Sequence, residues 1–220
     1  MSVGLLSGDP VGDLPKALAL AVYVLAVVFL GKPLYDYIYR RVGSRGVAVY
    51  YVRKYIHVFA GGVVAILVPY VFTSPVIPLV MGLALGVFLL VMRRVRPMYW
   101  FQVDDNMFEV NFTIAWGASI AVLWVITGDP KIAVVPALFI AFGDAITGVV
   151  RNMLFARRTK HWAGNLAMLP VTAILGYLYA GIPGLAAGIV AAVVERYEYP
   201  PIDDNVLITL SSTIILLLLA

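Results

Sequence analysis

The chain has 220 residues, of which 62% are hydrophobic and only 13% are charged, and its formal net charge is +4. Its mean hydropathy of +0.95 is higher than the core of a soluble protein of this size requires, so the composition excludes a soluble globular domain and indicates an integral membrane protein. Because the chain has no cysteine, disulfides and thiolate metal sites are excluded as well.

Eight apolar segments predict an all-α, polytopic fold in a single transmembrane domain of residues 1–220. Turn-forming residues separate several of them, as at Thr73–Pro75 and Gly181–Gly184. The last three segments are short for a span of ~20 residues, so either the bilayer thins there or the adjoining loops dip into a protein-lined cavity. In chain order the segments are Leu14–Leu30, Val47–Phe72, Val76–Met92, Met107–Thr127, Lys131–Val150, Asn165–Ala180, Pro183–Val194 and Val206–Ala220.

The basic residues fall almost entirely on one side of this topology. If the N-terminus is outside, fourteen of the sixteen Lys and Arg residues are cytoplasmic, and only Lys16 and Lys131 are not. Most acidic residues lie on or near the same side, and the outer connections are short. This asymmetry favours an enzyme at the cytoplasmic membrane surface over a transporter. The fourteen are Lys32, Arg40, Arg41, Arg45, Arg53, Lys54, Arg93, Arg94, Arg96, Arg151, Arg157, Arg158, Lys160 and Arg196.

Asp144 is the most informative residue, because it lies in the otherwise apolar segment Lys131–Val150. It is about six residues, or roughly 9 Å along a helix, inside the basic end at Arg151. A charge at such a position costs about 2.5–3.5 kcal/mol, so the carboxylate needs a cation, a proton or a water-filled cavity as its partner. A functional role is the favoured interpretation, and a structural acid satisfied by a neighbouring helix is the alternative.

The second apolar segment begins with two cations and a histidine. Arg53 and His57 are four residues apart and share one face of a helix. With Lys54 they suit a polyphosphate, since Arg donates bidentate hydrogen bonds and Lys supplies a point charge. Positive-inside anchoring is the alternative for the two cations, whereas His57 at the start of an apolar helix favours a functional role.

The sequence around Asp144 places small and polar residues on the same helix face. Gly143 and Gly148 allow close approach of a neighbouring helix or of a ligand. Asp144, Thr147 or Gly148, and Arg151 recur at spacings of three to four and are predicted to face one cavity. A small-residue packing face would explain the glycines but not the acid.

The connection between the fifth and sixth segments is a candidate phosphate-binding loop. It is basic, contains Lys160 and Gly164, and precedes the helix that begins near Asn165. Backbone N–H groups at a helix N-terminus form an anion site together with Lys and Arg. The loop lacks the spacing of a Walker A motif, and a basic juxtamembrane loop without a ligand is the alternative.

Carboxylates gather before the last segment. Glu195, Asp203, Asp204 and Asn205 offer the hard oxygen ligands that Mg²⁺ prefers. The alternative, which is compatible with metal binding, is that Asp204 or Asn205 caps the last helix.

A similar run, Asp104-Asp105-Asn106, precedes the fourth segment and is followed by Glu109. Here capping is favoured over a contact with metal or substrate. Taken together, cations, clustered carboxylates and a buried acid on one face predict phosphoryl transfer, which depends on positioning and charge neutralisation. The acceptor is predicted to be lipidic, because the site is at membrane depth.

Four motifs in this order resemble the polyprenol kinase family, which includes dolichol kinase, phytol kinase and the CTP-dependent diacylglycerol kinase. The chain departs from the family pattern at Ala163 and Asn165, where Glu and then Ser or Thr are usual. The distantly related CDP-lipid synthases also carry a Gly-Asp phrase, but their further Lys-Arg and Lys-Asp pairs are missing here. The motifs are Arg53-Lys54…His57, Gly143-Asp144…Thr147-Gly148, Lys160-His161-Trp162-Ala163-Gly164 and Glu195…Asp204-Asn205.

The resemblance implies CTP as phosphate donor, a divalent metal such as Mg²⁺, and a lipid alcohol such as dolichol, geranylgeraniol or phytol as acceptor. Asp144 is the first choice for the base near the lipid hydroxyl and Glu195 the second. The residues predicted to hold nucleotide or phosphate are Arg53, Lys54, His57, Gly143, Thr147, Gly148, Arg151, Lys160, Gly164 and Asn165. The residues predicted to hold the metal are Asp203, Asp204, Asn205 and Asp144.

The resulting hypothesis is a multi-pass kinase whose site faces the cytoplasm, in the plasma membrane if the source is prokaryotic. A cytidylyltransferase that makes a CDP-activated lipid and a non-enzymatic lipid carrier are the alternatives. No nucleic-acid partner is expected, and composition does not distinguish CTP from ATP.

Overall fold

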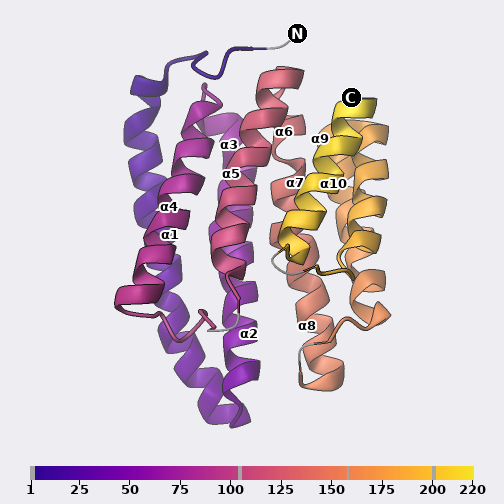
Figure 1. Ribbon diagram of the computed structural model, residues 1–220. Helices are drawn as coiled ribbons and strands as arrows, with labels where there is room; N and C mark the ends of the chain where they lie inside the picture. Colours follow the sequence, from indigo (N-terminus) through magenta and orange to yellow (C-terminus); the bar gives the residue numbers. More distant parts are fainter. Residues whose placement is uncertain (1–2, 104–105, 158, 200–201) are drawn as a thin grey trace.

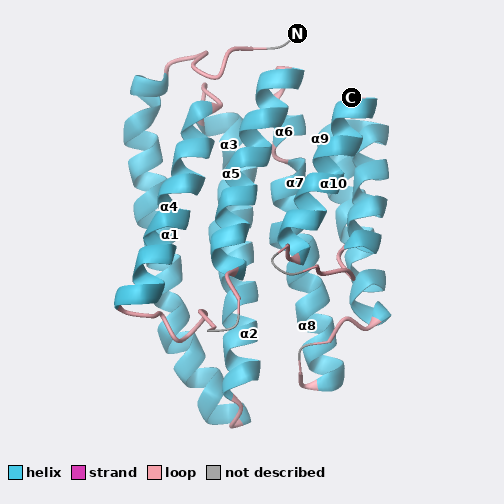
Figure 2. Cartoon of the chain, in the orientation of Figure 1, coloured by secondary structure: helices cyan, strands magenta, loops and turns pink. Residues whose placement is uncertain are grey.

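The computed structural model describes residues 3–103, 106–157, 159–199 and 202–220. Helices make up 82% of the protein, and the described residues contain no strand (Figures 1 and 2). In chain order the elements are α1 (Pro10–Val42), α2 (Arg45–Ile56), η1 (His57–Gly62), α3 (Val63–Val71), α4 (Val76–Val95), α5 (Phe108–Thr127), α6 (Pro130–Ala133), α7 (Val135–Leu138), η2 (Phe139–Gly143), α8 (Asp144–Phe155), α9 (Trp162–Val194) and α10 (Asp204–Leu219).

Six helical runs are long and apolar enough to cross a membrane, judged by length and composition. They confirm the predicted all-α membrane fold at that level, whereas the count of eight spans and the orientation stay predictions. The C-terminal α10 has 16 residues and is a shorter apolar helix. The six runs are Pro10–Val42, Arg45–Val71, Val76–Val95, Phe108–Thr127, Pro130–Phe155 and Trp162–Val194.

The helix ends follow from local capping. At the start of α1, the Asp9 carboxylate accepts a hydrogen bond from the Gly12 N–H at 2.9 Å, and Pro10 occupies the first helical position. The helix ends at Gly43, whose φ of 68° is the left-handed conformation that glycine adopts without strain. Ser44 then caps α2, so the chain reverses direction within two residues.

The first predicted segment is too short. It ends at Leu30, but α1 continues to Val42, so Lys32, Arg40 and Arg41 lie on a helix rather than in a connection. Hydropathy falls there, yet the helix persists because the Tyr35 ring packs edge-on against Tyr99 with centroids 5.6 Å apart. Similarly, α2 begins at Arg45 rather than at Val47, so Arg45 is also helical. Arg53 and Lys54 lie on this helix, as predicted.

Two of the long helical runs contain a π-helical turn, η1 and η2, and these turns contact each other. A π turn loosens the α-helical hydrogen-bond pattern. In η1, other side chains use the main-chain carbonyls: Tyr23 donates to the Phe59 oxygen at 2.8 Å, and Trp116 donates to the Gly61 oxygen at 3.1 Å. The irregular turn η1 is therefore held by hydrogen bonds from α1 and α5.

The 33-residue α9 is two helical halves joined by a sharp break. Gly181 has φ 59° and ψ −141°, a conformation essentially restricted to glycine. The Thr172 hydroxyl donates to the Gly188 carbonyl at 2.8 Å, although the residues are sixteen apart in sequence. The halves therefore fold back against each other, as predicted from the turn residues at Gly181–Gly184.

The polar connections lie at one end of the bundle. Figure 1 shows the connections that follow α1, α4, α8 and α9 towards that end, and both termini at the other. The connection between α9 and α10 does not reach as far as the ends of α1, α2 and α8. Of the two alternatives for the short C-terminal segments, a thinner bilayer or loops that dip inward, this arrangement favours the second.

Candidate active site

Asp144 is paired with a cation from a different helix. Its Oδ2 atom lies 2.6 Å from Lys54 Nζ, and all of Lys54, His57 and Asp144 are buried. His57 Nδ1 lies 3.2 Å from the same oxygen, without hydrogen-bond geometry. The Thr147 hydroxyl donates to the Asp144 carbonyl at 2.8 Å and lies 3.3 Å from Oδ1. Lys54 is therefore the counter-ion that a carboxylate at this position requires.

The π turns bring these groups together. His57 is the first residue of η1, and Asp144 directly follows η2. Gly61 and Gly62 leave room for aromatic rings, since a Cβ atom on them would lie 2.5 Å from Phe112 and 2.6 Å from Phe142, respectively. The contact between two irregular turns thus sets where the imidazole meets the carboxylate.

Arg151, about two turns after Asp144 on α8, forms a second buried ion pair. Its two terminal nitrogens contact the two Glu195 oxygens at 2.6 and 2.7 Å, in a bidentate arrangement. Its Nε atom donates to the His161 carbonyl at 2.9 Å, and one terminal nitrogen also donates to Asn165 Oδ1 at 2.9 Å. Arg151 therefore ties α8 to the end of α9, and its guanidinium makes four hydrogen bonds from its five N–H donors.

Lys160 bridges several carboxylates from the connection between α8 and α9. Its Nζ atom lies 2.5 Å from Asp204 Oδ2, 3.2 Å from Glu195 Oε1 and 3.3 Å from Glu198 Oε1. Burial alone would lower the pKa of Lys160, but the Asp204 and Glu195 carboxylates outweigh it and raise the pKa above its usual range. Lys160 is the most exposed member of these ion pairs, at 24% of its side chain.

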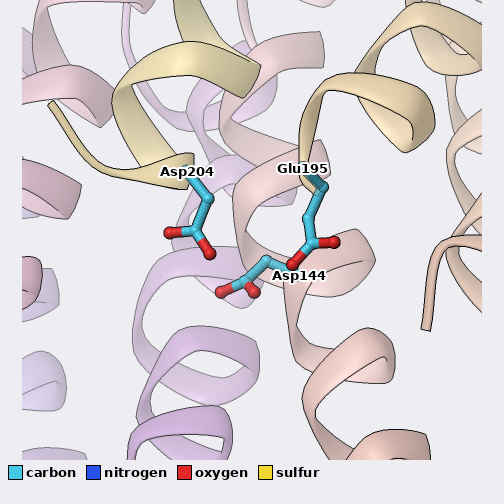
Figure 3. A group of neighbouring side chains, drawn as sticks. All are labelled: Asp144, Glu195 and Asp204. Atoms are coloured by element: carbon cyan, nitrogen blue, oxygen red, sulfur yellow. The ribbon is translucent and has the colours of Figure 1, made fainter. Parts of the chain in front are cut away.

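Three acids converge where these ion pairs meet. Ligand oxygens of Asp144, Glu195 and Asp204 lie within 4.8 Å of one another. Figure 3 shows the three carboxylates pointing toward one another from the start of α8, the end of α9 and the start of α10. Burial raises the pKa of Glu195, although its hydrogen bond with Arg151 acts in the opposite direction. The acids and the three paired cations, Lys54, Arg151 and Lys160, balance in formal charge.

Asp203 lies beside this cluster rather than in it. It caps α10 by accepting from the Val206 N–H at 3.1 Å, and its other oxygen accepts from Asn111 at 3.1 Å. The predicted capping role at this helix start is thus borne by Asp203, not by Asp204 or Asn205. Burial, reinforced by repulsion from Asp204, raises the pKa of Asp203 to about 6. The Asn205 Oδ1 atom is buried and has no hydrogen-bond partner among the described residues.

Two of the glycines singled out in the sequence, Gly148 and Gly164, leave space for the side chains of buried cations. A Cβ atom on Gly148 would overlap the Lys54 side chain, and one on Gly164 would overlap the Arg151 guanidinium. Gly143 instead serves helix packing, since its Cβ would lie 2.7 Å from Thr172. Gly143 and Gly148 thus allow close approach of neighbouring helices, as the sequence predicts, whereas approach of a ligand stays a prediction.

A small polar pocket of about 20 Å³ opens among these groups, room for roughly one water. Arg53 lines it and stacks on Phe108, with its guanidinium carbon 4.4 Å from the ring centre. Tyr50 and Thr159 also line the pocket, and the sequence did not predict them as site residues. Tyr50 is four residues before Lys54, so helical spacing was the available signal. A second, apolar cavity of about 470 Å³ also includes Arg53 in its lining.

The acids near the start of the fourth predicted segment are not part of this cluster as far as the structure describes them. Glu109 is buried 3.3 Å from Arg93 and 3.1 Å from the Gln102 amide nitrogen, where it holds the connection between α4 and α5. Asp104, Asp105 and the basic loop residue Arg158 lie outside the described residues.

A comparison of the chain with protein families, curated proteins and solved structures finds no match.

Proposed function

We propose that the protein is a CTP-dependent lipid-alcohol kinase that transfers the γ-phosphate of CTP to a polyprenol such as dolichol, geranylgeraniol or phytol. The observation that carries this proposal is the convergence of Asp144, Glu195 and Asp204 with three cations in a polar pocket next to an apolar cavity. Phosphoryl transfer requires charged groups for the phosphates, and a lipid acceptor requires an apolar surface within reach.

The donor set fits a hard divalent cation. Three carboxylates lie within 4.8 Å of one another, and the buried Asn205 Oδ1 atom has no hydrogen-bond partner in the described part of the chain. Asp144, Glu195, Asp204 and Asn205 would hold Mg²⁺, which would neutralise phosphate charge there. Asp203 is less suited than the sequence analysis predicts, because it is not among the acids whose oxygens lie within 4.8 Å of one another.

Nucleotide binding requires side chains to move, because a pocket of about 20 Å³ is too small for a triphosphate. Lys160 is the candidate for this movement, since it is the most exposed of the paired cations and comes from a connecting segment. Released from Asp204, its ammonium group would bind phosphate oxygens together with Arg53. Arg151, by contrast, would act on the site by orienting Glu195.

In the proposed reaction the lipid hydroxyl oxygen forms a bond to the γ-phosphorus, and the bond from that phosphorus to the β,γ-bridging oxygen breaks. CDP leaves with the electron pair. The hydroxyl proton passes to Asp144, whose Oδ1 atom has only the weak Thr147 contact at 3.3 Å, with Glu195 as the second choice of base. Lys54 and His57 keep the carboxylate in position.

The proposal includes eight membrane spans with the N-terminus outside and the site facing the cytoplasm, in the plasma membrane if the source is prokaryotic. Counting the two halves of α9 separately and adding α10 supports the eight spans. The positive-inside distribution of Lys and Arg supports the orientation.

The decisive experiment follows each phosphate of the nucleotide separately. Purified protein is incubated with geranylgeraniol, phospholipid acceptors and Mg²⁺, using CTP labelled at either the α- or the γ-phosphate. We expect only the γ-label in the lipid. The α-label in lipid would indicate a cytidylyltransferase, and no label in lipid would favour a carrier. Replacing CTP with ATP tests the nucleotide.

A further inference from the structure

The cavity of about 470 Å³ lies between α1, α2, η1, α4 and α5 and has polar groups at one end only. Its polar or charged lining consists of Arg53, His57, Glu109 and Thr113, all from the end of the bundle that carries the polar connections. The remaining lining residues are apolar. A site with this distribution suits an amphiphile with one polar end.

The cavity is long. On α1 its lining extends from Leu14 to Val28, which at 1.5 Å per residue is about 21 Å. An extended hydrocarbon chain can therefore lie along α1 with its polar head group at the Arg53–His57 end.

The polar end of the cavity adjoins the carboxylates. Arg53 lines both the cavity and the polar pocket, and His57 lines the cavity while its Nδ1 lies 3.2 Å from Asp144. The Glu109 Oε2 atom is buried at this end without a hydrogen-bond partner among the described residues. A buried, unsatisfied acceptor is costly, and a hydroxyl donor would satisfy it.

The cavity also reaches the outer surface of the bundle. Leu18 on α1 and Val80 and Phe88 on α4 line it, yet these side chains are exposed. In a bilayer they face lipid, so a chain can enter sideways between α1 and α4.

We propose that this cavity binds the hydrocarbon chain of a single-chain isoprenoid alcohol, with the hydroxyl group at the Arg53–His57 end beside Asp144. The inference rests on the proposed function for the hydroxyl head group. It adds a location and a direction of entry, and it commits to a single-chain acceptor rather than a two-chain one such as diacylglycerol.

The test is photo-crosslinking, which needs no catalytic turnover. The full chain is placed in phospholipid nanodiscs with a geranylgeraniol analogue that carries a diazirine near its apolar end, and crosslinked peptides are mapped by mass spectrometry. We expect crosslinks on α1 near Ala17 and Ala21. Excess unlabelled geranylgeraniol should remove them, whereas excess dioleoylglycerol should not.

Variants that fill the cavity provide the control. Ala21→Trp and Ala84→Phe each place a ring into the lining and should lower saturable crosslinking about tenfold, because an overfilled site loses on the order of one tenfold step in affinity. Ala19→Trp adds the same bulk at the same depth of α1, at an exposed position outside the lining, and should leave crosslinking unchanged.

Dispersed crosslinks that geranylgeraniol does not compete for, or equal competition by dioleoylglycerol, would overturn the proposal. Saturable crosslinks at Ala17 and Ala21 without phosphate transfer would uphold the cavity and refute the kinase. Phosphate transfer with only dispersed crosslinks would uphold the kinase and refute the cavity as the binding site.

Discussion

At the scale of single residues, the site depends on ion pairs buried among helices. The pair of Asp144 with Lys54, 2.6 Å apart, stabilises two charges that neither helix could hold alone. The sequence indicated that Asp144 needs a partner and that Lys54 is functional. It did not pair them, because they are ninety positions apart and only the packing of α2 against α8 brings them together.

Asp144→Asn is expected to abolish phosphate transfer and to destabilise the fold. Removing the carboxylate leaves Lys54 buried without a counter-ion, which costs about 3–5 kcal/mol. The double variant Asp144→Asn/Lys54→Met removes both charges and should recover much of that loss without restoring activity. Thermal unfolding in detergent and γ-label transfer measure the two effects. Transfer at the wild-type rate in a folded variant of either kind would rule out Asp144 as the base.

Asp203 gives the protein a pH dependence. Its pKa is raised from 3.8 to about 6 by burial, so the folded state holds this proton at pH values where the unfolded chain has lost it. Stability is therefore expected to fall as the pH rises from about 4 to 6. Asp203→Asn should weaken that fall and stabilise the protein at pH 7 by on the order of 2–3 kcal/mol, since each pKa unit is worth about 1.4 kcal/mol.

The measurement is the thermal midpoint from pH 4 to 7 for both proteins. The amide retains an oxygen that can cap α10 but loses the hydrogen bond from Asn111, a loss that does not depend on pH, so the difference in pH profile reports the charge. Asp9→Asn is the matched control, because Asp9 also caps a helix but is exposed. Parallel pH profiles for wild type and Asp203→Asn would contradict the assignment.

At the scale of the elements, the sequence predicted turns better than helix ends. Glycine and proline around Gly181 marked the break in α9, because those residues restrict the backbone locally. The π turns left no comparable signal: their residues are as apolar as the α-helices around them, and their position depends on contacts from Trp116 and Phe112. The predicted end of α1 and start of α2 were wrong, because hydropathy shows which residues are apolar enough for the membrane, whereas both helices continue into polar sequence.

Gly181→Ala is expected to destabilise the protein by about 1–3 kcal/mol, because the conformation at φ 59° and ψ −141° strains any residue with a Cβ atom. An added Cβ would meet no atom within 4 Å, so the cost is backbone strain alone. Gly46→Ala, in α2, also meets nothing within 4 Å and lacks the unusual φ. It should be neutral or slightly stabilising, by about 0.5–1 kcal/mol. Equal midpoints for the two variants would mean that the break is not strained.

At the scale of the whole molecule, the charge distribution makes the orientation testable. The connections that follow α1, α4 and α8 lie towards the end of the bundle opposite the two termini (Figure 1), and the three carboxylates come together from the start of α8, the end of α9 and the start of α10 (Figure 3). The structure brings the predicted residues Asp144, Glu195 and Asp204 together, whereas the side of the membrane and the assignment of Arg151 and Lys160 to phosphate stay predictions. In the structure both are already bound to Glu195, a pairing that only the assembled bundle determines.

The absence of native cysteine allows single-cysteine mapping without background. Pro97→Cys, after α4, and Ile182→Cys, at the break of α9, are at exposed positions on opposite ends. With the N-terminus outside, a membrane-impermeant maleimide should label Ile182→Cys in intact cells and Pro97→Cys only after permeabilisation. The reverse pattern would invert the topology.

The sideways opening between α1 and α4 has a kinetic consequence. If the alcohol arrives through the bilayer while the nucleotide arrives from water, the two reactants are diluted in different volumes. The alcohol's mole fraction among membrane lipids, not its amount per litre, then governs how often the cavity is filled. Adding buffer to a vesicle suspension at constant CTP would leave the turnover per protein unchanged, whereas adding inert phospholipid to the same vesicles would slow it.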